Sequence, residues 1–229
     1  MSSPPRWSFA TSLATAILLS LSALGQDAGR RATDAFTSSI RAGTAWSQQP
    51  PVEMPGWDND AVIDALMEVI AAPDHTVPGQ GIYSSMRETA ASRLAYRRSM
   101  QKLDDPWDSR GLQAMLPARI APALLVALAE AKRTSKRSLR GHLLVALGAL
   151  DEPPSEAVAV IRAGLTDPDW HVVDRALTAT GTLGFHASGS ANDLERMLDA
   201  SPPGRWVVDS GRWRWDDMRM EIAGGLARV

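Results

Sequence analysis

Apolar residues recur at steps of three and four along residues 166–184, and this run is the clearest helical pattern in the chain. The apolar stripe consists of Val172, Ala176, Ala179 and Leu183. Asp167 is placed to cap the helix, and Pro168 would occupy its first position, where a missing N–H costs nothing. Small residues beside the stripe, among them Gly181, would let a neighbouring helix come close. The pattern therefore predicts an amphipathic helix that stacks against other helices.

The same pattern recurs along the chain and predicts helices in pairs. The apolar positions between Val62 and Ile70 follow the capping residues 58–60, and Ser85 and Glu88 form a capping box for a partner helix that ends near residue 101. The other predicted helices span residues 122–131, 136–150, 154–165, 168–184, 190–200 and 216–229. A single pair has too little apolar surface to fold alone, so the pairs must stack to complete a core.

The second helix of each pair starts with an apolar residue, followed in most pairs by arginine. The four aligned starts are Met86-Arg87, Leu139-Arg140, Val172-Val173 and Met218-Arg219. With the Ala, Leu and Gly residues that follow, these segments resemble the HEAT-like repeat family, including the short units of phycobilisome lyases. The resemblance covers about residues 58–229 and implies an all-α fold, a right-handed α-solenoid of about four antiparallel helix pairs.

The resemblance also implies structural roles for single residues. The family pairs its repeat arginine with acidic groups of adjacent units, which ties the units together. In the third unit Val173 stands where the family has this arginine. The expected structural repeat positions are Arg87, Arg140, Asp167, Gly181 and Arg219.

The amino-terminal residues are typical of an export signal. Arg6 supplies positive charge, residues 8–24 are uncharged and largely apolar, and Ala23 and Gly25 are small exit residues, so we expect a signal peptide over residues 1–25 with cleavage before Gln26. An uncleaved membrane anchor is the alternative, because the uncharged run approaches the length of a spanning helix. Residues 26–57 are rich in Ala, Ser, Thr, Gln and Pro and predict a mostly disordered spacer before the repeat domain, with a short amphipathic turn at residues 35–40 as the alternative. The expected location is the periplasm or the cell exterior.

Composition and motifs give no support for catalysis. The chain has no cysteine, which excludes disulfides and a thiol nucleophile, and its four histidines stand in no metal-ligand spacing. Asp167, Asp169 and His171 are close in sequence, but a turn that opens a helix uses aspartate for capping. We therefore expect no catalytic residues, no cofactor and no metal. A lyase-like enzyme, or a binder of small molecules or polyanions, remains the alternative that the resemblance leaves open.

Two segments carry candidate partner-binding residues. Five basic residues fall within nine positions at the entry to a second helix, where cations oppose the helix dipole and invite an anionic partner. A predicted hairpin between the last two helices interleaves tryptophan and arginine, which are frequent in interface hot spots. The candidates are Lys132, Arg133, Lys136, Arg137 and Arg140 in the first segment and Trp206, Arg212, Trp213, Arg214 and Trp215 in the second. A solvated turn and tryptophans packed between helices are the structural alternatives.

These patterns predict an exported, non-catalytic scaffold that binds another protein. The net charge of −2 disfavours nucleic acid as the partner. A cleaved signal would leave no integral membrane anchor. The last predicted helix has no polar capping unit after it, so self-association through residues 216–229 is a further expectation.

Overall fold

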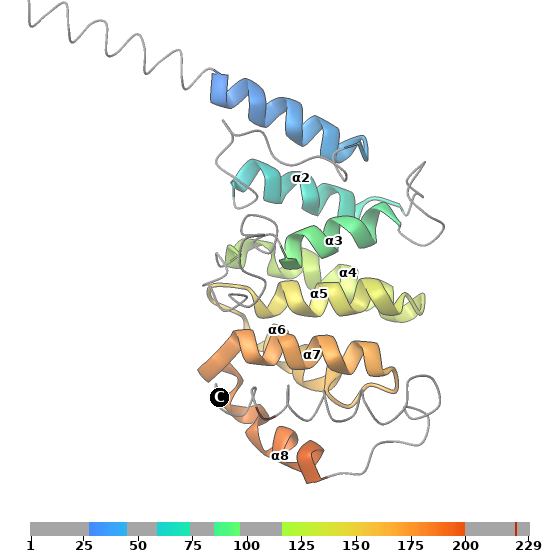
Figure 1. The fold of residues 1–229 in the computed structure, drawn as a ribbon, viewed down its shortest axis with the longest axis vertical. Helices are drawn as coiled ribbons and strands as arrows, with labels where there is room; N and C mark the ends of the chain where they lie inside the picture. Colours follow the sequence, from blue (N-terminus) through green and yellow to red (C-terminus); the bar gives the residue numbers. More distant parts are fainter. Residues whose placement is uncertain (1–27, 45–58, 74–84, 97–115, 200–222, 224–229) are drawn as a thin grey trace, which may run out of the picture. The chain divides into compact units, whose positions relative to one another are not determined.

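The computed structural model describes residues 28–44, 59–73, 85–96, 116–199 and 223 (Figure 1). Over these ranges the ordered elements are helices and none is a β-strand, which confirms the all-α class. The chain divides into two compact units, Met1–Ala65 and Leu66–Val229. The boundary falls inside helix α2, which spans Asp60–Ala71.

Part of the predicted spacer is helical, which corrects the expectation of disorder there. Residues 28–41 form a helix in which Phe36 and Ile40 are buried together with Thr33 and Thr37. These four positions follow the three- and four-residue steps of one helix face. The Thr33 hydroxyl donates to the Gly29 carbonyl at 3.0 Å, so its polar atom is satisfied within the helix. The alternative of a short amphipathic turn at residues 35–40 is therefore closer to the structure, and the helix extends it toward the amino terminus.

The first predicted pair forms as expected from its caps. In α2 the Asn59 side chain accepts a hydrogen bond from the Ala61 N–H at 2.8 Å. The apolar residues from Val62 to Ile70 are buried, except Met67, which is partly exposed. Helix α3 spans Met86–Tyr96. The Glu88 N–H donates to the Ser85 hydroxyl at 3.0 Å, which is one half of the predicted capping box. The Glu88 carboxylate does not return to this cap; it accepts a hydrogen bond from Ser138 instead.

The second pair begins with a short 3-10 helix, η2 (Ala118–Ile120), which leads into α4 (Ala121–Arg133) with Pro122 in its first turn as predicted. Helix α5 follows over Arg137–Gly148. Leu116 and Leu150 form an isolated parallel bridge in which Leu116 N–H donates to the Ala149 carbonyl at 2.7 Å. Both leucines are fully buried, so the segment entering α4 is anchored to the end of α5.

The third pair consists of α6 (Ser155–Gly164) and α7 (Trp170–Leu183). Pro154 stands at the N-cap of α6, where its fixed φ suits a helix start, as predicted. A 3-10 helix, η3 (Gly184–Ser190), then leads into α8 (Ala191–Asp199). The rest of the predicted fourth pair lies outside the described residues, apart from the helical Ala223.

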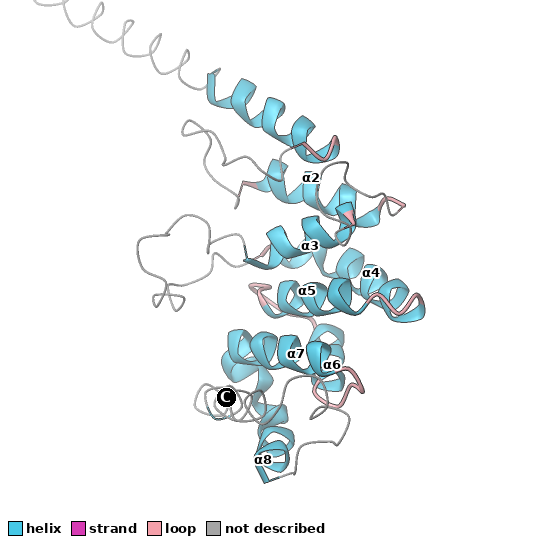
Figure 2. Ribbon diagram, turned by 45° about the vertical axis from the view of Figure 1, so that its right-hand side comes forward, coloured by secondary structure: helices cyan, strands magenta, loops and turns pink. Residues whose placement is uncertain are grey.

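Within the second unit, α3, α5 and α7 lie side by side in that order, with α4 and α6 in a second layer (Figures 1 and 2). Helix α5 is central because it contacts α3, α4, α6 and α7. Eight consecutive residues of α5 and its exit, Leu143 to Leu150, are buried, which fits a helix surrounded on several sides. The stack therefore places the polar residues of α3, α5 and α7 along one shared surface.

Candidate functional site

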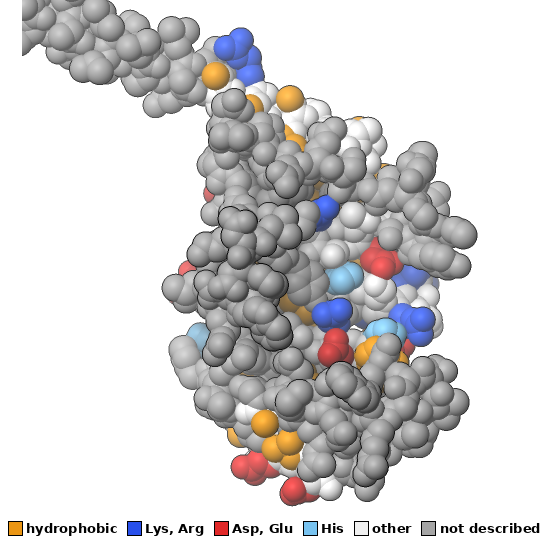
Figure 3. All heavy atoms as spheres, viewed as in Figure 1, with side chains coloured by type: hydrophobic (Ala, Val, Ile, Leu, Met, Phe, Trp, Pro, Cys, Tyr) orange, Lys and Arg blue, Asp and Glu red, His pale blue; other side chains and the backbone are white. Residues whose placement is uncertain are grey.

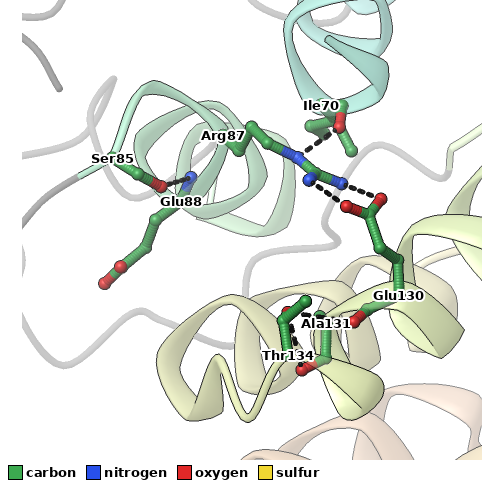
Figure 4. A network of polar contacts seen from close by, with 7 residues as sticks. All are labelled: Ile70, Ser85, Arg87, Glu88, Glu130, Ala131 and Thr134. Carbon is green, nitrogen blue, oxygen red and sulfur yellow. Dashed lines mark hydrogen bonds and ion pairs between the residues drawn. The ribbon is translucent and has the colours of Figure 1, made fainter. Parts of the chain in front are cut away.

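An arginine of α3 connects the first and second helix pairs. The buried Arg87 guanidinium donates two hydrogen bonds to the Glu130 carboxylate of α4, from Nη1 at 2.9 Å and from Nη2 at 2.8 Å (Figure 4). Its Nε donates to the Ile70 carbonyl at the end of α2 at 2.7 Å. The hydrogen bonds and the charge of Arg87 hold the pKa of Glu130 below its usual range. One side chain thereby joins α2, α3 and α4.

The second junction uses the next repeat arginine. Arg140 of α5 pairs with the Asp167 carboxylate, and both side chains are nearly buried, at 13% and 9% exposure. The prediction that Asp167 caps α7 from a first helical position at Pro168 is wrong. Asp169 is the N-cap and accepts a hydrogen bond from the His171 N–H at 3.0 Å, while Asp167 accepts from the Asp169 N–H at 2.9 Å. Asp167 therefore turns back toward Arg140 because the helix starts two residues later.

The third junction carries an ion pair that sequence reasoning missed. Val173, at the family's arginine position, is fully buried, and Arg162 of α6 pairs instead with Asp193 in the first turn of α8. Arg196 adds a second cation to the same carboxylate from one turn along α8. The sequence indicated only the helical spacing of Arg162 within α6, and it gave no sign of the partner Asp193. Each described junction between successive pairs thus holds one arginine–carboxylate pair.

Polar side chains, all partly buried except the exposed Ser138, line one side of α3, α5 and α7, and we call this surface the three-helix face. It consists of Ser85, Glu88, Thr89 and Ser92 of α3, Ser138 and His142 of α5, and His171, Asp174, Arg175 and Thr178 of α7. The Ser138 hydroxyl donates to the Glu88 carboxylate, which links α3 to α5 on this face. Figure 3 shows histidine, basic and acidic side chains gathered on this side of the molecule.

The centre of the three-helix face is a histidine beside an arginine. A Cβ atom added at Gly141 would fall 2.7 Å from Cγ of Arg175, so the aliphatic part of Arg175 lies directly against α5. Burial lowers the pKa of the neighbouring His142 to about 4, and the charge of Arg175 acts in the same direction. His142 is therefore neutral at pH 7, and Arg175 carries the positive charge at this point of the face.

The predicted basic segment spans the end of one helix and the start of the next. Lys132 and Arg133 lie in the last turn of α4, Lys136 is the N-cap of α5, and Arg137 is its first residue. The expectation that all these cations oppose a helix dipole is wrong for Lys132 and Arg133, because a helix C-terminus attracts cations. All four side chains are exposed, whereas Arg140 is not part of this surface and points to Asp167. We call Lys132, Arg133, Lys136 and Arg137 the basic turn.

The remaining predicted site residues lie away from the helix contacts or outside the described residues. Gly181 is only partly buried, and the close approach of α5 and α7 falls at Gly148 instead. The second candidate segment and the last repeat arginine lie outside the described residues: Trp206, Arg212, Trp213, Arg214, Trp215 and Arg219.

The described part of the chain brings together no group of three His, Asp or Glu side chains that could hold a metal ion. Asp167 and Asp169 are engaged by Arg140 and by the start of α7, and the His171 ring stacks on Trp170 with 3.6 Å between ring centroids. A search of the described helices for one both long and apolar enough to cross a membrane finds none.

No protein-family model, no curated protein and no solved structure matches this chain.

Proposed function

We propose that this chain is an exported, non-catalytic scaffold of HEAT-like repeats, arranged as a right-handed α-solenoid, which binds another protein on the three-helix face. The observation that carries the proposal is the side-by-side order of α3, α5 and α7, with one arginine–carboxylate pair at each described junction. Such pairs fix the register of successive units and so present a rigid surface.

The residues of the three-helix face suit recognition of a polypeptide. Ser, Thr, Asp and His side chains offer both donors and acceptors, and Arg175 adds a charge next to the neutral His142. Most of these side chains are partly buried, and the exposed Ser138 is held by its hydrogen bond to Glu88, so binding would cost less conformational entropy than at free, fully exposed side chains. The export signal predicted over residues 1–25 would bring the surface to partners outside the cytoplasm.

Site-specific photocrosslinking in the native host tests the proposal. A photoreactive amino acid is placed at Asp174 or Thr178 on the three-helix face, and at Val126 or Ala159, exposed on α4 and α6, as matched controls. We expect one discrete adduct from the first two positions and none from the controls. Adducts of equal strength from both sets, or none from the face, would contradict the proposed docking surface.

Mass spectrometry of the mature amino terminus tests export separately. We expect the chain to begin at Gln26. A protein recovered from the cytosol with Met1 intact would contradict export while leaving the docking surface open to the crosslinking test.

A further inference from the structure

The basic turn concentrates four positive charges on one exposed loop. Lys132, Arg133, Lys136 and Arg137 are all exposed, and no acidic residue occurs between Glu130 and Asp151 in the sequence. The chain as a whole has a net charge of −2, so this local excess is opposite in sign to the average. An excess of this kind creates a local potential that attracts anionic groups.

The backbone of the basic turn is held in a defined shape. The Lys136 N–H donates to the Ala131 carbonyl at 2.9 Å and the Ser135 N–H to the Lys132 carbonyl at 3.2 Å, the two hydrogen bonds of a Schellman motif. Ser135 adopts the left-handed conformation that this motif requires, with φ of 54°. The Thr134 hydroxyl closes the end of α4 by donating to the Glu130 carbonyl at 2.9 Å. The four cations therefore project from a preorganised turn rather than from a flexible loop.

Glu130 and Asp167 are engaged by arginines outside the basic turn. Both oxygens of Glu130 accept hydrogen bonds from Arg87, with a smaller electrostatic contribution from Arg133, and Asp167 pairs with Arg140. Lys132, Arg133 and Arg137 therefore outnumber the acidic side chains that the sequence places beside them.

Local stability accounts for only half of this charge. Lys132 and Arg133 suit the C-terminus of α4, but Lys136 and Arg137 stand at the N-terminus of α5, where no acidic residue is present in the first turn. Cations at that end of a helix are unfavourable because the helix dipole is positive there. The dipole therefore does not explain the position of Arg137, whereas an external anion would.

The surroundings favour a polypeptide over a membrane or a nucleic acid. Among the described residues Val126 is the large hydrophobic side chain with high exposure, at 70%, and it precedes Lys132 by nearly two helical turns. The described residues therefore place no large exposed apolar side chain beside the turn that would insert into lipid. The net negative charge opposes a long phosphate backbone. Carboxylates suit the guanidinium groups of Arg133 and Arg137, which can hold them through two parallel hydrogen bonds.

We propose that the basic turn docks an acidic polypeptide segment, a short run of Asp and Glu side chains on a partner protein. The segment would lie across the turn, with carboxylates at Arg133 and Arg137 and the two lysines adding non-directional attraction. The three-helix face takes no part in this contact, so the inference stands or falls independently of the proposed docking on that face.

The test is fluorescence anisotropy of a labelled Glu-rich peptide of roughly 10 residues, titrated with the full chain at roughly 50 mM salt, where charge interactions are little screened. The variant K132Q/R133Q/K136Q/R137Q removes the basic turn. The matched control R30Q/R31Q/R41Q/R119Q removes the same charge from other exposed arginines. We expect the first variant to weaken binding about tenfold or more and the control to change it less than about twofold. Circular dichroism melting establishes that both variants are folded.

Three outcomes would overturn the inference. Equal weakening by both variants would mean that only net charge matters, and no measurable binding by the unaltered chain would mean that the turn is merely solvated. Turn-dependent binding that is tighter to duplex DNA, or to vesicles of phosphatidylcholine and phosphatidylglycerol in a roughly two-to-one ratio, would assign the surface to a phosphate-bearing partner. A variant altered at Asp174 and Thr178 should bind the peptide as the unaltered chain does.

Discussion

Gly148 of α5 lies directly against the backbone of Ala179 in α7. A Cβ atom added at Gly148 would fall 2.7 Å from both Cα and the carbonyl oxygen of Ala179. Real Cβ atoms do not approach other atoms so closely, and backbone atoms cannot turn aside as a flexible side chain can. Helices α5 and α7 are the most extensively packed pair in the stack. They can approach this closely only because Gly148 has no side chain.

Replacing Gly148 with alanine should push these helices apart. We expect Gly148→Ala to lower the free energy of unfolding by about 1–3 kcal/mol through overpacking, in spite of alanine's higher helix propensity. Gly189→Ala is the control, since a Cβ there would meet only Nη1 of Arg162, at 3.9 Å. Urea denaturation measures both changes. Equal stability of the two variants would show that α7 shifts without cost.

The buried and exposed junction pairs should differ in energy. We expect Arg140→Met to cost about 2–4 kcal/mol, because it leaves the Asp167 carboxylate, only 9% exposed, without its cation. Arg162→Met removes a guanidinium that is 48% exposed and should cost less than about 1 kcal/mol. Chemical denaturation of the two variants provides the comparison. The reverse order would mean that the outer pair, rather than the inner one, holds the units in register.

Glycine in place of Ser135 should increase the stability of the fold. Its φ of 54° is unfavourable for an L-residue, so we expect Ser135→Gly to raise the free energy of unfolding by about 0.5–1 kcal/mol. Ser138→Gly, three residues later in α5, should have the opposite sign, because it places glycine in a helix and removes the hydrogen bond to Glu88. Thermal melting of both variants measures the contrast. A loss of stability in Ser135→Gly would contradict the assigned conformation of the turn.

His142 should make stability depend on pH. Its folded pKa of about 4 lies below the ordinary value of 6.5, so between these values the unfolded chain binds a proton that the folded chain does not. The free energy of unfolding should therefore fall as pH decreases from about 6.5 to about 4, by at most about 3 kcal/mol, and this contribution should not change further below pH 4.

The variant His142→Leu provides the control for this effect. It should lose that component of the pH dependence while the contributions of the other histidines and of the carboxylates stay the same. Denaturation curves at several pH values measure the difference between the two proteins. Parallel pH profiles would show that His142 is protonated in the folded protein as readily as in solution.

Local sequence signals determined most of the helices. These signals act within one or two helical turns, so they can be recognised in a single sequence. They are the apolar steps from Val62 to Ile70, the helix starts at Pro122 and Pro154, and the Ser85 cap. The all-α class and the positions of α2 to α8 follow from such signals. The four cations of the basic turn were visible for the same reason, since they are neighbours in the chain.

Contacts between distant residues were decided only by the tertiary structure. The sequence predicts Asp167 as a helix cap, but in the fold it pairs with Arg140, 27 residues earlier. Arg162 likewise pairs with Asp193, 31 residues later. Gly148 appears to be an ordinary helix end until α7 lies against it. The three-helix face exists only where α3, α5 and α7 are side by side. The physical reason is that periodicity and capping are properties of one segment, whereas an ion pair, a close approach or a shared surface depends on how segments pack together.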